Sequence, residues 1–311
     1  MPFLYFLESI RHPVLDTLFS LITLCGEETV FMAVGMMIFW CVDKYRGYYL
    51  LCVGFLGTVI NQFLKMLCRV PRPWVKDPHF TIVESAREAA SGYSFPSGHT
   101  QTAVGLFGGI ARMTAHRWLR IAAIALAALV ALSRMYLGVH TPADVLTSLA
   151  IATVLLLVAY PLFEKARHSP RLMTAILLSF VGIMIAYLCF ILLYPFPAEV
   201  YTEEAIHNLE SARKNGFTLL GCALGLPLVY AVDMKWTHFE TRAAWWVQII
   251  KVVGGLLIVV LVKELLRAPL DAIFGGHLAA RSVRYFLMVI AGGVLWPMSF
   301  RHLAKLEQNK K

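Results

Sequence analysis

The stretch WLRIAAIALAALVALSRMYLGVHTPADVLTSLAIATVLLLVAYPL, residues 118–162, holds two long apolar runs separated by a polar turn. Each run is about 20 residues long, the length of helix that the hydrocarbon core of a bilayer requires. The turn between them carries Ser133, Arg134, His140 and Asp144, and ionisable side chains are costly near membrane depth. The stretch therefore predicts two spanning helices that present ionisable groups where they meet.

The whole chain has the composition of a polytopic membrane protein. Its 311 residues are 59% hydrophobic and 15% charged, and the mean hydropathy is +0.67, whereas a soluble domain carries about a quarter charged residues. A net charge of +9 would suggest nucleic acid as the partner of a soluble protein. Here the Lys and Arg lie mostly between apolar runs, so lipid headgroups and membrane topology account for them better, and no nucleic-acid partner is expected.

Apolar runs of sufficient length predict about nine spanning helices. They cover residues 27–42, 47–67, 98–114, 118–138, 142–162, 172–194, 216–233, 247–266 and 284–301. Before them, the segment 13–25 has apolar residues at helical spacing and is expected to lie in the interface or to lengthen the first span. The predicted fold is all-α, a polytopic transmembrane bundle. Its predicted parts are an N-terminal interfacial helix (1–29), a core (30–165) and additional C-terminal transmembrane helices (166–311).

Alternation of nine spans sorts the loops onto two sides of the membrane. The short loops on one side are basic, and their cations include Lys44, Arg46, Arg112, Arg117, Arg120, Lys165, Arg167 and Arg171. The positive-inside rule places that side in the cytoplasm, and the 68–97 loop and the 139–142 turn outside it. We therefore expect a multi-pass protein of a bacterial plasma membrane whose active site faces the extracytoplasmic side.

Three polar clusters interrupt the apolar sequence on the side of the 68–97 loop. They are KMLCRVPRP, with Lys65 and Arg72, then PSGH (96–99), then SRMYLGVHTPAD (133–144). Each has a plain structural explanation when taken alone. A lysine at a helix end snorkels, and Ser97 is a good helix N-cap. Three cations, two histidines and an acid at helix ends on one membrane face together favour a functional site.

HTPAD, by itself, is also a helix start. Thr141 would be the N-cap, Pro142 would occupy the first helical position, and Asp144 would lie in the first turn. A single histidine at such a place is more often a buried, hydrogen-bonded residue than a catalyst. Because the three clusters occur together, a catalytic site is favoured over separate helix starts and buried histidines.

The residue types fit a site for a phosphate ester. Lys65, Arg72 and Arg134 can neutralise phosphate oxygens, the arginines through bidentate contacts. A helix N-terminus offers free N–H groups to an anion, and Gly98 lets the backbone approach closely. Ser97 adds a hydroxyl donor. Together these groups would hold a phosphate at the start of the helix at 98–114.

Two histidines can divide the work of phosphoryl transfer. One would attack phosphorus and form a phosphohistidine, and the other would protonate the leaving oxygen. Asp144 follows His140 by four residues and could hydrogen-bond the second nitrogen of its ring. No metal or other cofactor is expected, because three fixed cations supply the charge. The acids and the six cysteines show no metal-ligand spacing.

K-x6-R-P, P-S-G-H and S-R-x5-H-x3-D resemble the three signature motifs of the type-2 phosphatidic acid phosphatase superfamily. Its relatives include membrane lipid phosphatases, glucose-6-phosphatase, bacterial acid phosphatases and vanadium haloperoxidases. All three motifs are complete and in the family's order, and the resemblance covers about residues 30–165. It implies a metal-independent phosphatase with His140 as nucleophile, His99 as general acid and Asp144 as the partner of His140. By the same resemblance, the phosphate would be held by Lys65, Arg72, Ser97, Gly98 and Arg134.

The substrate class has two readings within this resemblance. Motifs at headgroup level suit a substrate whose tail stays in the bilayer, so we expect a lipid phosphate or an isoprenyl pyrophosphate. The alternative is a phosphatase or phosphotransferase for a small soluble phosphoester, as in the glucose-6-phosphatase branch. The extra C-terminal helices keep open a third reading, a transporter that reuses the scaffold, although degenerate motifs would suit it better than intact ones. The lipid, the oligomeric state and the role of the acidic 195–215 loop are left open by the sequence.

Overall fold

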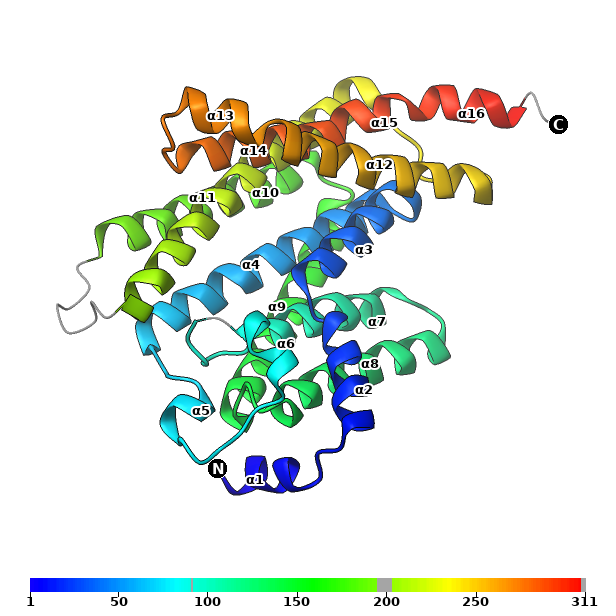
Figure 1. Cartoon of the computed structure of the whole chain (residues 1–311). Helices are drawn as coiled ribbons and strands as arrows, with labels where there is room; N and C mark the ends of the chain where they lie inside the picture. The colour runs from blue at the N-terminus through cyan, green and yellow to red at the C-terminus, as the bar shows by residue number, and fades with distance from the viewer. Residues whose placement is uncertain (91, 195–202, 309–311) are drawn as a thin grey trace. The chain divides into compact units, whose positions relative to one another are not determined.

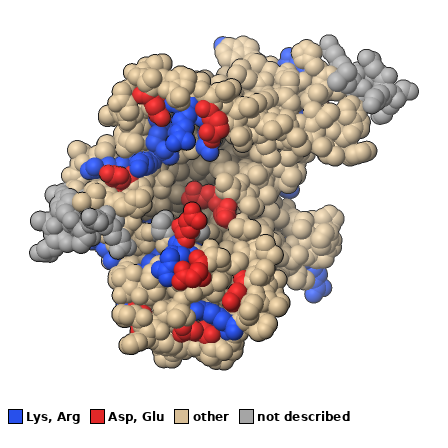
Figure 2. Space-filling model, in the orientation of Figure 1, with Lys and Arg blue, Asp and Glu red and all other residues tan. Residues whose placement is uncertain are grey.

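The computed structural model describes residues 1–90, 92–194 and 203–308, and every regular element in these ranges is helical (Figure 1). The all-α prediction is thereby confirmed. Charged side chains form a few separate groups on the face drawn in Figure 2, and most of that face is uncharged. Such a surface suits a protein whose surroundings are largely lipid.

Six helical stretches in the described chain are long and apolar enough to cross a membrane. A seventh span results if α2 (Pro13–Leu24) and α3 (Glu28–Cys41), which are bent by 46° at their junction, count as one. The sequence predicted about nine spans. Of the two predicted spans outside this set, 98–114 forms a continuous helical run, Gly98–Met113, that is shorter than a span requires, and 247–266 forms the helix α12. The six stretches are Lys44–Lys76, Arg117–Tyr136, Pro142–Ala166, Pro170–Leu193, Ala205–Thr237 and Ala279–Ala304.

The chain divides into two compact units, of which the first comprises Met1–Gly35, Tyr49–Pro161 and residues 203–208 of the described chain. Besides α2 and the start of α3, it contains one long helix in full, most of two others and several short elements. Its elements are α1 (Pro2–Ser9), α4 (Lys44–Cys68), α5 (Pro73–Lys76), two 3-10 turns (Glu84–Ala86 and Glu88–Ala90), α6 (Gly98–Ala103), a π-helical segment (Val104–Gly108), α7 (Gly109–Met113), α8 (Arg117–Tyr136) and α9 (Pro142–Ala166).

The second unit comprises Met36–Tyr48 and residues 162–194 and 209–308. It contains the ends of several helices named above and most of the C-terminal half of the chain that the structure describes. Its further elements are α10 (Pro170–Leu193), α11 (Glu203–Val232), a π-helical segment (Asp233–Thr237), α12 (Trp245–Leu265), α13 (Arg267–Ile273), α14 (Ala279–Ile290), a second π-helical segment (Ala291–Leu295), α15 (Trp296–Met298) and α16 (Phe300–Gln308).

The acidic segment 195–215 lies between two predicted spans, 172–194 and 216–233, and its sequence suggests a linker. In the structure α11 begins at Glu203 and continues to Val232 without a break, so residues 203–215 are the first turns of a long helix. Residues 195–202 of the linker lie outside the described residues. The linker is therefore shorter than the sequence suggested.

The helix that follows the 139–142 turn begins as its sequence predicts. The Thr141 hydroxyl accepts a hydrogen bond from the Asp144 N–H (3.3 Å), and the Asp144 carboxylate accepts one from the Thr141 N–H (2.7 Å). Two N–H groups at the start of α9 are thus satisfied reciprocally, as in a capping box. The predicted N-cap at Thr141 is confirmed, and this cap fixes the carboxylate of Asp144 beside the turn that carries His140.

Helix α8 organises the first unit, since α1, α2, α6 and α7 all pack against it (Figure 1). Small residues on its buried face, Ala123, Ala127 and Ala131, allow close approach. At its end, the Tyr136 hydroxyl donates to the Asp16 carboxylate of α2 (2.7 Å), and the Tyr136 and Phe19 rings stack at 4.3 Å. These contacts hold α2 against the end of α8, which carries the start of the third polar motif.

Candidate active site

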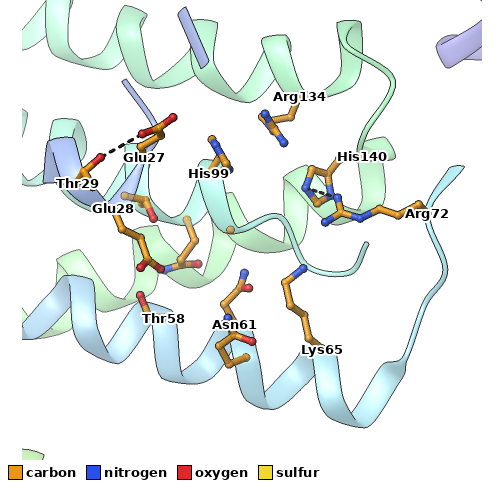
Figure 3. A pocket seen from close by; sticks show the side chains of 15 residues that line it. Glu27, Glu28, Thr29, Thr58, Asn61, Lys65, Arg72, His99, Arg134 and His140 are labelled. Carbon is orange, nitrogen blue, oxygen red and sulfur yellow. Dashed lines mark hydrogen bonds between the residues drawn. The ribbon is translucent and has the colours of Figure 1, made fainter. Parts of the chain in front are cut away.

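A cavity of about 360 Å³ lies within the first unit, and the three polar motifs converge on it (Figure 3). α4 contributes one face of it, α6 and α8 contribute others, and the bend between α2 and α3 closes it. The residues that line it are Gly26, Glu27, Glu28, Thr29, Thr58, Asn61, Gln62, Lys65, Arg72, Gly98, His99, Gln101, Thr102, Arg134 and His140. Six of the eight residues predicted from the sequence are among them.

The three predicted phosphate-binding cations reach the cavity from three different segments. Lys65 lies in the last turn of α4, Arg72 immediately precedes α5, and Arg134 lies in the last turn of α8. Arg72 and Arg134 are 5% and 1% exposed. Burying two guanidinium groups beside a lysine is unfavourable without a compensating anion, so the arrangement indicates a site built for a negatively charged ligand.

Each cation is held in place by neutral oxygens. The Lys65 ammonium donates to the Tyr93 carbonyl, and Arg72 donates from Nε to the Gly92 carbonyl (2.8 Å). Arg134 donates from Nη1 to the Thr23 hydroxyl (2.8 Å), while its Nε has no hydrogen-bond partner among the described residues. Neutral acceptors orient the side chains without cancelling their charge, which leaves the charge available to a ligand.

The ring of His140 is oriented by Arg72. Arg72 Nη1 lies 3.0 Å from His140 Nε2, and a guanidinium group can only donate hydrogen bonds, so Nε2 accepts and carries no proton. His140 lies in the turn between α8 and α9. Burial first, and then the positive charge of Arg72, holds the pKa of His140 well below its ordinary value, so the ring is neutral near pH 7. A neutral ring with an unprotonated Nε2 is the form that a nucleophile requires.

Asp144 lies on the other side of the His140 ring, with its Oδ2 3.5 Å from Nδ1. That distance is longer than an ordinary hydrogen bond, and Nδ1 has no hydrogen-bond partner among the described residues. The same Oδ2 instead accepts from the Ser94 hydroxyl (2.5 Å) and the Thr141 N–H (2.7 Å). The expected pair is therefore adjacent and buried, and a small movement of the ring would close the bond.

The helix start at Ser97 forms behind the cavity surface. Ser97 caps α6, where its Oγ accepts from the Thr100 N–H (3.4 Å) and also from the Thr100 hydroxyl (2.9 Å). It is buried without lining the cavity. Gly98 and His99 do line the cavity. α6 continues through the π-helical segment into α7, so the cap begins a helical run that extends to Met113. Of the predicted residues, only Ser97 and Asp144 do not line the cavity.

Several residues of the site were not predicted from the sequence. Ser94 and Thr23 hold Asp144 and Arg134, and neither belongs to a motif. Asn61 and Gln101 line the cavity from α4 and α6. The sequence does indicate Asn61 as a site residue, because it is a polar residue one turn before Lys65 in an apolar helix. Thr23 had no comparable signal, since its contact depends on the packing of α2 against α8.

The fold and the cavity define a class: a polytopic helical membrane protein with a buried, cationic, histidine-containing site that fits a phosphate group. Residues 46–168 match the family model described as PAP2 superfamily. Residues 217–309 match the model described as PAP2 superfamily phosphatase, transmembrane extension. The chain belongs to the PAP2 superfamily, the type-2 phosphatidic acid phosphatase superfamily that its motifs resemble.

Three curated relatives illustrate the range of the similarity. Sphingosine-1-phosphate phosphatase 2 of Homo sapiens is 27% identical over 150 residues, which cover 46% of this chain and 37% of the relative. Undecaprenyl-diphosphatase BcrC of Bacillus subtilis is 33% identical over 102 residues, covering 33% and 50%. Phosphatidylglycerophosphatase B of Bacillus subtilis is 27% identical over 172 residues, covering 51% and 80%. The chain thus spans half or less of the first two relatives' own lengths.

Proposed function

We propose that this protein is an integral-membrane, metal-independent phosphatase that acts on a lipid phosphate or an isoprenyl pyrophosphate through a phosphohistidine intermediate. The observation that carries the proposal is the orientation of His140. Its unprotonated Nε2 lines a cavity that also contains Lys65, Arg72 and Arg134. A nucleophile beside three cations suits attack on a phosphate group, whose own negative charge would otherwise repel the lone pair.

The proposed reaction has two steps. In the first step, Arg72 exchanges its hydrogen bond to His140 Nε2 for one to the substrate phosphate, and the freed Nε2 lone pair attacks phosphorus. The bond from phosphorus to the ester oxygen breaks, and the leaving oxygen takes a proton from His99. Water then attacks the phosphohistidine, gives its proton to His99, and displaces the His140 nitrogen, so that inorganic phosphate leaves and both histidines return to their first state. Asp144 stabilises the positive charge that the His140 ring carries while it is phosphorylated.

The substrate class follows from the membrane setting. Lys65 ends a spanning helix, and Arg134 and His140 lie where α8 ends and α9 begins, so the phosphate would be bound at the level of lipid headgroups. The names of the relatives include a sphingoid phosphate, an undecaprenyl diphosphate and a phosphatidylglycerophosphate as the molecules they act on. A lipid phosphate in the bilayer is therefore the substrate class that we propose, and for a diphosphate the leaving group would be the lipid monophosphate.

We further propose that the predicted core, 30–165, carries the chemistry and that the cavity faces the extracytoplasmic side of a bacterial plasma membrane. In support, the cavity residues that belong to the three motifs all fall within this core, while Gly26, Glu27, Glu28 and Thr29 line the cavity from the segment before it. The loops that bring the motifs together, 68–97 and 137–141, are those that the positive-inside rule places outside the cytoplasm.

The test of the function is phosphate release in detergent with EDTA present. Wild-type protein should release inorganic phosphate from lipid phosphates with EDTA as fast as without it, since three fixed cations neutralise the substrate. His140→Ala should lower kcat by at least about 10³-fold. Equal, slow release by both proteins would eliminate the hydrolase function, and loss of wild-type activity in EDTA would eliminate the metal-independent mechanism.

A further inference from the structure

The turn that carries His140, residues 137–140, lies between α8 and α9 and is not itself helical. The last carbonyl groups of a helix have no partner within the helix, so they need donors from elsewhere. Three carbonyl groups at the end of α8 and in the turn accept hydrogen bonds from other segments. These pairs are Tyr136 O with Arg11 Nε (3.1 Å), Leu137 O with the Val83 N–H (3.1 Å) and Val139 O with Arg72 Nη1 (2.9 Å). The backbone that leads to the proposed nucleophile is thus held from outside.

Arg11, which lies between α1 and α2, joins the end of α8 to the 68–97 loop. Its Nε donates to the Tyr136 carbonyl, and its Nη1 donates to the carbonyl (2.9 Å) and the hydroxyl (3.1 Å) of Thr81. Glu8 of α1 accepts from the Thr81 N–H (2.9 Å) and lies 4.0 Å from Arg11 Nη1. The Arg11 side chain is only 10% exposed. One largely buried guanidinium group therefore connects two segments that are far apart in the sequence.

The turn packs closely against this guanidinium group at Gly138. Gly138 has a φ of +82°, a conformation that glycine adopts without strain. A Cβ at this position would lie 2.7 Å from Arg11 Nη2 and 3.1 Å from both the Phe80 ring and the Thr81 carbonyl oxygen. The Arg11 guanidinium also lies 5.4 Å from the centre of the Phe80 ring. The turn and Arg11 are therefore fitted to each other two residues before His140.

Arg11 is not needed merely to fasten α1. The Tyr5 hydroxyl donates to the Asp77 carboxylate (2.7 Å), and the Tyr5 and Phe80 rings pack edge to face with their centres 5.6 Å apart. These contacts already attach α1 to the 68–97 loop. The Nε of Arg11 instead reaches the end of α8, where a positive charge is favourable because unpaired helix carbonyls gather there. What Arg11 adds is a connection to the turn that carries His140.

We propose that Arg11 is a positioning residue for the nucleophile: by fixing the backbone from Tyr136 to Gly138, it keeps the His140 ring in place. The inference rests on the proposed function and adds to it a residue outside the three motifs and outside residues 46–168, which match the family model. Arg11 acts through the turn and contacts no reacting atom. A displacement of about 1 Å at a reacting group can cost about 100-fold in rate.

Substrate binding and nucleophilic attack should separate in an Arg11 variant. The three phosphate-binding cations are each held by a group that does not depend on Arg11. These groups are the Tyr93 carbonyl for Lys65, the Gly92 carbonyl for Arg72 and the Thr23 hydroxyl for Arg134. A variant that loses only the support of the turn should therefore still bind phosphate, while the His140 ring attacks more slowly.

The test measures kcat, KM and the inhibition constant of inorganic phosphate for the full chain in detergent. Arg11→Gln removes the charge and the fork of donors, and it should lower kcat about 10- to 100-fold. The inhibition constant of inorganic phosphate should stay within about twofold of the wild-type value. Arg11→Lys keeps the charge but offers one point of attachment in place of a fork, so its kcat should fall between the two. Thermal unfolding shows whether each variant is folded.

Arg87→Gln is the matched control. Arg87 is an exposed arginine of the same loop that pairs with Glu84, so this variant should keep the wild-type kcat. A wild-type kcat in folded Arg11→Gln, or in Arg11→Lys should the glutamine variant not fold, would overturn the inference. A loss of phosphate affinity with kcat unchanged, or an equal fall of kcat in Arg87→Gln, would also overturn it. If the wild-type protein itself releases no phosphate, the proposed function fails instead.

Discussion

At the scale of single residues, the site depends on how each charged group is held before substrate arrives. Arg72 contacts the His140 ring directly and so fixes which nitrogen is unprotonated. Arg134 is anchored at Nη1 by the Thr23 hydroxyl, so its guanidinium group is already oriented. Groups fixed in advance stabilise a transition state without reorganising during the reaction.

We predict that Arg134→Lys lowers kcat/KM by at least about 100-fold, because an ammonium group cannot reproduce the planar fork that reaches Thr23 and a phosphate oxygen together. Steady-state phosphate release measures the effect. The elution profile and thermal unfolding in detergent would show whether the variant is folded. Near-normal kinetics in a folded variant would remove Arg134 from the phosphate-binding set.

Ser94→Ala tests the support of Asp144. The serine hydroxyl is one of two donors to Asp144 Oδ2, and both groups are buried. Without it the carboxylate is less firmly oriented toward His140, so kcat should fall about tenfold with little change in KM. Ser94→Thr keeps the hydroxyl and should recover part of the rate. A change confined to KM would assign Ser94 to substrate binding instead.

At the scale of elements, the bend between α2 and α3 positions His99. A Cβ on Gly26 would lie 2.7 Å from Val130 Cγ1 on α8 and 3.2 Å from His99 Cβ on α6, so three helices meet at this glycine. The bend also presents Glu27 and Glu28 to the cavity. A single backbone position thus sets the place of the proposed general acid.

Gly26→Ala should lower kcat about tenfold by displacing His99 and should reduce stability by about 1–3 kcal/mol, as overpacking does. Gly182→Ala on α10 is the matched control, because a Cβ there meets no atom within 4 Å. The control should retain full activity and gain slightly in stability, since alanine favours a helix over glycine. Wild-type kcat in Gly26→Ala would show that this contact does not position the acid.

The helix ends that carry the motifs were predictable because their signals are local. Ser97 and Thr141 are caps whose sequence neighbours suffice to identify them, and the caps form as expected. The change from α-helix to π-helix after Ala103 was not predictable, because the sequence of the π-helical segment Val104–Gly108 is an ordinary apolar one. Contacts between distant segments, such as Thr23 with Arg134, follow from packing that one sequence does not encode locally.

At the scale of the whole molecule, the residues of the cavity belong to the first unit, and the second unit has buried charges of its own. Lys44 donates to Asp233 at 2.5 Å, and Lys251 donates to the Glu240 and Thr241 carbonyls at 3.0 and 3.2 Å. The extra C-terminal helices, which the sequence could only describe as hydrophobic, match the transmembrane extension of the family. The division into 1–29, 30–165 and 166–311 stays a prediction.

The orientation in the membrane can be tested with a native cysteine. Cys68 is exposed at the end of α4, at the start of the 68–97 loop. In intact cells, a membrane-impermeant maleimide should label a variant that retains only Cys68. It should not label a cysteine-free variant that carries His116→Cys, because the exposed loop before α8 is predicted to lie in the cytoplasm. The reverse pattern would invert the topology.

The most direct test of the central claim is to trap the phosphorylated enzyme. Protein mixed with a phosphate-labelled lipid substrate and quenched in base within one turnover should carry label on a single peptide containing His140. The label should be stable in base and labile in acid, as a phosphohistidine is, and absent from His140→Ala. Rapid turnover with no labelled protein at any quench time, or label on another residue, would contradict the proposed mechanism.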